Sequence, residues 1–223
     1  MGSACPALRL CDIDHICSLA FKLDVLEYAT YDLRSQLSPK PTPSGHVVLI
    51  PIEHNTIKKL RREPEAGDWL KLVTKLAQAK PAQVVSFVNP SQLHGTYDEL
   101  SMLAEATANI NFSYGENDLP KSGLARLEPL APPFEHIAVE PAPKTADRTV
   151  LAKDGVTRRL ILTYENQFTL LPRLANAVNG FSHESDYKGA FSFLDSTQAL
   201  IRFHREGAFA SVKFIDLIEG RFD

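Results

Sequence analysis

The stretch GHVVLIPIEHNTIKKL, residues 45–60, decides how this chain folds. Residues 47–52 are apolar without a break, which is typical of a strand buried on both faces of a sheet. The polar trio Glu53, His54 and Asn55 ends this run, and a short helical pattern follows it. The stretch therefore predicts a buried strand that leads into a helix, with His54 starting the turn and Asn55 as the helix N-cap.

Strand and helix patterns alternate further along the chain. Residues 82–90 and 109–114 are strand-like, and residues 98–108 between them are helical. A helix that covers a sheet is predicted upstream by apolar residues at i, i+3, i+4 and i+7: Trp69, Leu72, Val73 and Leu76. Strand–helix–strand order favours parallel neighbours. We therefore expect residues 47–52 and 83–88 to be adjacent parallel strands at the centre of the sheet.

The second half of the chain has a different pattern. Residues 118–136 are rich in proline and predict a loop or a lid. The Asp154-Gly155 pair is a strong hairpin signal between two probable strands. The remaining predicted elements are strands at 136–140, 149–152 and 159–164, a helix at 170–178, and further strands with a short helix near the end. The predicted fold class is α/β, with a central mixed, partly parallel sheet, covering helices and a hairpin-rich second half.

A long leading helix is predicted at residues 16–37. Its apolar residues follow the a/d pattern of a coiled-coil seam, with Thr30 as the one lapse: Ile16, Leu19, Leu23, Leu26, Thr30, Leu33 and Leu37. Other apolar residues give the helix a second apolar side. Either both sides pack on the chain's own body, or one side meets a partner chain. We expect a homodimer contact through Leu19, Leu23 and Leu26, and the prolines of residues 38–45 end the helix.

Composition narrows the classes of function. The 223 residues include 24 basic and 27 acidic side chains with no basic block, so a nucleic-acid partner is not expected. Cys5, Cys11 and Cys17 are spaced by six and cannot converge on one metal if they lie on a helix. The chain contains no dinucleotide-binding glycine motif, P-loop or nucleophile elbow. We expect no cofactor and no metal.

The candidate ligand-binding residues are Glu53, His54 and Asn89. They end two predicted parallel strands, and ligands of open α/β sheets bind at the carboxyl ends of strands. Adjacent strands are about 4.8 Å apart, so Glu53 and Asn89 could reach one small ligand. Glu53 beside His54 could also perform acid–base chemistry, as in a small α/β hydrolase or transferase. Without a nucleophile motif or a metal set nearby, catalysis is the weaker interpretation. The trio is read first as a strand end and a helix cap, and ligand binding by Glu53 is the alternative.

Taken in order, several segments resemble the second type of CHASE domain, an extracytoplasmic sensor of bacterial receptors. The most specific are the hairpin DGVTRRLIL and the helix start LLPRLA. The others are YDLRSQL, VVLIPIEHNTI, VVSFVNP, YDELSMLAEATANINF and GAFASVKFIDLIEG. The resemblance covers roughly residues 24 to 220. Glu53 replaces the family's usual aspartate, and Val88-Asn89 stands where the second strand commonly ends with an aspartate.

The resemblance implies a single sensor domain without enzymatic activity. Residues 1–15 would be a linker or added segment, residues 16–37 the signalling helix, and residues 46–223 the α/β body. The intact protein would have flanking membrane helices, an extracytoplasmic location for this domain, and a cytoplasmic kinase or nucleotide cyclase. Its cue would be an unidentified small molecule or another extracytoplasmic signal. The resemblance carries over no catalytic residue and no known ligand.

Overall fold

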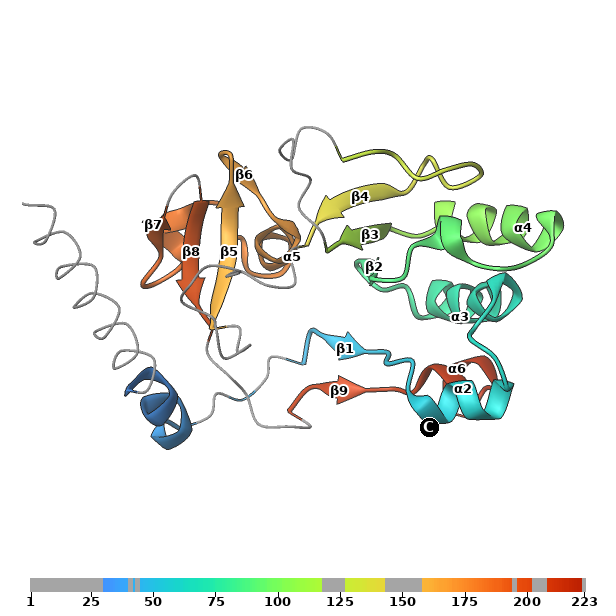
Figure 1. The fold of residues 1–223 in the computed structure, drawn as a ribbon, viewed down its shortest axis with the longest axis horizontal. Coiled ribbons are helices and arrows are strands. Elements are labelled where there is room, and N and C mark those ends of the chain that lie inside the picture. Colours follow the sequence, from blue (N-terminus) through green and yellow to red (C-terminus); the bar gives the residue numbers. More distant parts are fainter. Residues whose placement is uncertain are drawn as a thin grey trace, which may run out of the picture.

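The computed structural model describes residues 30–39, 42, 45–117, 127–142, 158–193, 196–201 and 208–221. These residues form a mixed α/β fold with both parallel and antiparallel sheets, which confirms the predicted fold class (Figure 1). The strands lie in three separate sheets rather than in one central sheet, and their orders are β1-β9, β2-β3-β4 and β6-β5-β8-β7.

The helices agree closely with the sequence patterns. They are α2 (His54–Leu60), α3 (Ala66–Ala79), α4 (Tyr97–Ala108), α5 (Leu170–Asn179) and α6 (Phe214–Ile218), with 3-10 turns η1 (Pro90–Gln92) and η4 (Glu184–Asp186). The strands are β1 (Val48–Leu49), β2 (Val84–Ser86), β3 (Phe112–Glu116), β4 (Ala138–Pro141), β5 (Arg159–Tyr164), β6 (Gln167–Phe168), β7 (Phe191–Phe193), β8 (Ser196–Leu200) and β9 (Ala210–Ser211).

The predicted strand–helix–strand unit is confirmed at β2, α4 and β3. β2 pairs with β3 in parallel, with Val84 opposite Phe112, and β3 pairs in parallel with β4. The connecting helix α4 starts with a reciprocal cap, in which the Thr96 hydroxyl accepts from the Glu99 N–H and the Glu99 carboxylate accepts from the Thr96 N–H. This capping box fixes where the crossover helix begins.

The predicted pairing of residues 47–52 with residues 83–88 is wrong. β1 pairs in parallel with β9, with Val48 opposite Ala210. In Figure 1, β1 and β9 point towards α2 and α6, whereas β3 and β4 point the opposite way. The reason is that two helices, α2 and α3, separate β1 from β2. A single crossover helix returns the chain to a parallel neighbour. Here the chain runs in one direction through β1 and α2, and in the opposite direction through α3 and β2.

The predicted burial of the first strand on both faces is also wrong. The side chains of Val48 and Leu49 are 54% and 50% exposed. Only Ile50 and Ile52, which follow β1, pack against the hydrophobic core. The apolar run at residues 47–52 is therefore explained by the core contacts of Ile50 and Ile52, and not by a central position of the strand in the sheet.

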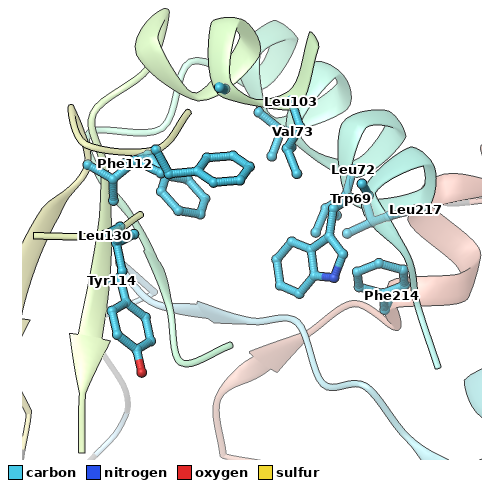
Figure 2. Close-up of a cluster of buried hydrophobic side chains, with 13 residues drawn as sticks. Trp69, Leu72, Val73, Leu103, Phe112, Tyr114, Leu130, Phe214 and Leu217 are labelled. Carbon is cyan, nitrogen blue, oxygen red and sulfur yellow. The ribbon is translucent and has the colours of Figure 1, made fainter. Parts of the chain in front are cut away.

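The main core lies between the parallel sheet and the helices α3, α4 and α6. Trp69 of α3 packs edge-on against Phe214 of α6, with ring centroids 5.4 Å apart (Figure 2). Leu130 and Phe134 are 6% and 1% exposed and belong to the same core. They come from the proline-rich stretch predicted as a loop or lid. Its described part, residues 127–136, is therefore anchored in the core and is not a free lid.

The antiparallel sheet forms a second, smaller body with α5. β5 begins and ends where the sequence predicted, and Leu162 of β5 and Leu170 of α5 are fully buried. The Thr169 hydroxyl donates to the Ile161 carbonyl at 2.7 Å and fastens the start of α5 to β5. The predicted strand at 149–152 and the hairpin at Asp154-Gly155 lie outside the described residues, as do Cys5, Cys11 and Cys17.

The end of the leading helix is described at residues 30–37, where the predicted helix is confirmed. Tyr31, Asp32 and Ser35 are half-buried, whereas Leu33 and Leu37 are 55% and 76% exposed. The upstream part of the predicted seam, including Leu19, Leu23 and Leu26, lies outside the described residues.

Candidate functional site

The end of β1 carries an ion pair that joins two helix starts. Glu53 precedes α2 and Lys213 precedes α6, and the Lys213 ammonium lies 3.2 Å from the Glu53 carboxylate. Both side chains are about two-fifths to one-half exposed. A solvent-screened pair of this kind contributes little to stability. Glu53 thus finds a basic partner from a distant part of the sequence.

The expectation that Asn55 caps the following helix is wrong. The helix begins at His54, and Glu53 is the N-cap residue in an extended conformation. The Glu53 carbonyl accepts from the Thr56 N–H at 2.9 Å. Thr56 is fully buried, so the helix must start early enough to turn this residue towards the core. His54 and Asn55 are left exposed in the first turn.

Asn89 follows β2 and performs a local capping role. Its side-chain oxygen accepts from the Ser91 N–H at 2.9 Å at the start of η1. β2 is parallel to β3, which runs opposite to β1 (Figure 1). Glu53 and Asn89 therefore end strands of different sheets that run in opposite directions. The structure does not bring them together at one sheet edge, because β1 and β2 are not neighbours.

The carboxyl edge of the parallel sheet gathers polar residues from β3 and β4. The Tyr114 hydroxyl donates to the Glu116 carboxylate at 3.1 Å. Glu140 of β4 binds Arg173 of α5 with an N–O distance of 2.7 Å, and the Glu140 side chain is only 15% exposed. This edge faces the smaller body in Figure 1. It is the place in an α/β sheet where ligands usually bind.

Glu116, Glu140 and Arg173 were missed in the sequence. The signal for the two acids was present, because each lies near the end of a strand-like segment, as Glu53 does. Nothing in the sequence pairs Arg173 with Glu140, which lies 33 positions away.

The leading helix is attached to the smaller body by two consecutive residues. The Arg158 guanidinium donates to both Asp32 carboxylate oxygens, at 2.9 and 2.7 Å. The Tyr31 hydroxyl donates to the Ile201 carbonyl. Burial, followed by the negative charge of Asp32, raises the pKa of Tyr31 above its usual value. The phenol therefore remains a hydrogen-bond donor at neutral pH.

Within the described ranges, no three side chains of His, Cys, Asp or Glu come together as a metal ion would require. None of the helices in these ranges combines the length and apolar character needed to cross a bilayer.

Comparison with known families gives one match. The family model described as the CHASE2 domain matches residues 13–223 of this chain. No curated protein matches the chain, and no solved structure matches it.

Proposed function

The chain belongs to the CHASE2 domain family, and we propose that it senses a small polar molecule and passes the signal through a dimer of its leading helix. CHASE2 domains are non-catalytic, extracytoplasmic sensor modules of membrane receptors. The match over residues 13–223 carries the sensor function. In the intact bacterial receptor, the output is a cytoplasmic kinase or a nucleotide cyclase, reached through membrane helices that flank this domain.

The two faces of the leading helix support the dimer. With about 100° of rotation per residue, the mean direction of Leu33 and Leu37 lies about 170° from the mean direction of Tyr31 and Asp32. The latter two contact the body, whereas the seam leucines are exposed. The alternative in which both sides pack on the chain's own body is not favoured at these positions. A second copy of the same seam is the natural partner, since the a/d spacing continues upstream through Leu26, Leu23 and Leu19.

The carboxyl edge of β2, β3 and β4 is the better place for the cue. It combines the carboxylates of Glu116 and Glu140 with the guanidinium of Arg173 at the junction of the two bodies. Such a set of charges suits a small polar molecule that carries hydrogen-bond donors. Glu53 and His54, at the start of α2, remain a second proposed contact. Hydrolase or transferase chemistry at Glu53 and His54 is set aside, because CHASE2 sensor domains are non-catalytic.

The dimer is tested by a charge placed on the seam. Leu33→Glu and Leu37→Glu together should convert a dimer to a monomer in analytical ultracentrifugation, with an unchanged circular dichroism spectrum. Leu171→Glu is the matched control, because Leu171 is 45% exposed on α5, away from the seam. A monomeric wild-type chain, or a dimer that survives both substitutions, would refute the proposed seam.

The cue site is tested by native mass spectrometry of protein purified from its own host. A co-purified small molecule should be lost with Glu116→Gln and retained with Glu53→Gln, since the two changes remove the same charge beside different sheets. The reverse pattern would place the site at the end of β1. Loss with neither substitution would reject both locations.

A further inference from the structure

We propose that Tyr31, Asp32, Arg158 and Ile201 form a clamp that couples the antiparallel sheet to the leading helix. This inference deepens the proposed function and rests on it for its biological meaning, because the helix is the element that carries the dimer seam. In this proposal, the contact that regulates the leading helix lies at one end of β5 and β8, and not at the parallel sheet.

The polar contacts of the clamp are directional. Arg158 is 5% exposed and holds Asp32 with two parallel N–H···O bonds. A bidentate pair of a guanidinium and a carboxylate has a narrow range of favourable geometry. The neighbouring Tyr31 hydroxyl binds a backbone carbonyl of the same sheet. The helix is therefore held in one rotational setting, which apolar packing alone would not specify.

The clamp grips the two central strands of the antiparallel sheet. Arg158 directly precedes β5, and Ile201 directly follows β8. The Ile201 N–H donates to the Arg158 carbonyl at 2.9 Å, so the two clamp residues are themselves joined across the strand pair. A change in the register or spacing of β5 and β8 must either move the helix or break charge-assisted hydrogen bonds.

The seam lies on the opposite side of the helix from the clamp. A rotation imposed through Tyr31 and Asp32 would turn Leu33 and Leu37 by the same angle, since a helix rotates as a rigid cylinder over one or two turns. The clamp thus converts a small movement at the end of the sheet into a new orientation of the dimer contact.

The test measures amide hydrogen exchange of residues 30–37 in the chain. Asp32→Asn should speed this exchange about tenfold to a hundredfold, as loss of a hydrogen bond to a charged group predicts. Tyr31→Phe is the milder variant and should act in the same direction without loss of the fold. Asp216→Asn is the matched control, because Asp216 pairs with Arg221 at an exposed site.

Coupling is measured by a double-mutant cycle. Ala199→Gly loosens β8, because glycine weakens a strand, and should speed exchange of residues 30–37. In the Tyr31→Phe and Asp32→Asn backgrounds, the added effect should shrink to less than about twofold if the clamp carries the coupling. Ala104→Gly removes an equally buried methyl group from α4 and should leave the helix unchanged.

The proposal is overturned in either of two cases. In the first case, Ala199→Gly acts equally with and without the clamp. In the second case, exchange of the buried Leu162 amide in β5 rises together with that of the helix in both clamp variants. The first result removes the coupling, and the second makes the clamp merely structural. Repeating the cycle with Leu33→Glu and Leu37→Glu separates this outcome from failure of the dimer, because the clamp lies within one chain.

Discussion

The loop before α4 passes so close to the start of α3 that we expect a side chain added at Gly95 to clash with Ala66. Gly95 lies in the loop before α4, beside Ala66 at the start of α3. The His94 carbonyl accepts from the Ala66 N–H at 2.8 Å, so the loop and the helix start are held together. A Cβ added at Gly95 would lie 2.6 Å from the Ala66 Cβ. Ala66 is fully buried and has no flexible side chain that could move aside.

The size of the effect follows from this distance. Two carbon atoms in contact prefer a separation of about 3.5–4.0 Å, so Gly95→Ala requires the two backbones to separate by about 1 Å. Overpacking of this kind costs about 1–3 kcal/mol, and reduced freedom of the unfolded chain offsets about 0.4–1 kcal/mol of it. We expect a net loss of about 1–2 kcal/mol in the free energy of unfolding. For a chain of this length, the melting temperature would fall by about 2–8 °C.

Urea unfolding measures this loss. Trp69 is the chain's one tryptophan and lies in the adjoining core, so its fluorescence reports the transition. Ala66→Gly provides the matched rescue, because it removes the methyl group that the new Cβ would strike. The double variant should be no less stable than Ala66→Gly alone, with a favourable coupling of about 1–2 kcal/mol. A neutral Gly95→Ala, or two effects that simply add, would refute the close approach.

Two further predictions concern titration and a buried carboxylate. The pKa of Tyr31 is raised in the folded chain, so the stability that Tyr31 contributes is fully present below pH 10 and is lost as the pH rises through the pKa of the folded state. Tyr31→Phe should therefore flatten the fall of the melting temperature above pH 10. An unchanged slope would contradict this. Asp68 is 4% exposed and binds Arg62 at 2.5 Å, so Asp68→Asn should lower the free energy of unfolding by about 1–3 kcal/mol. The exposed Asp98→Asn serves as its control, and equal losses in urea unfolding for both variants would argue against a role for burial.

Local patterns predicted most of the elements of this fold. The apolar spacing around Trp69, the segment before Tyr164 and the LLPRLA start each led to a helix or strand close to the observed one. These predictions succeeded because hydrophobic periodicity and capping depend on residues only a few positions apart, so the sequence shows the pattern directly. The family resemblance was confirmed for the same reason, since it rests on the order of such local segments.

The candidate site was predicted less well. Glu53 and Asn89 each follow a strand and open a helical turn, but the predicted pairing of the two strands was wrong. Both helices between these strands, α2 and α3, were predicted, but the reversal of chain direction between them was not, and this reversal changes the direction of β2 relative to β1. Strand direction is therefore sensitive to a single misassigned turn, whereas strand existence is not.

Long-range contacts arose only in the folded chain. Asp32 and Arg158 are 126 positions apart, and Glu140 and Arg173 are 33 positions apart. No local pattern selects such partners, because any acid could pair with any base until packing brings two of them within hydrogen-bond distance. Periodicity thus predicted the elements, including the end of the leading helix, while the partners of Glu53, Glu140 and Asp32 depended on how distant elements pack against one another.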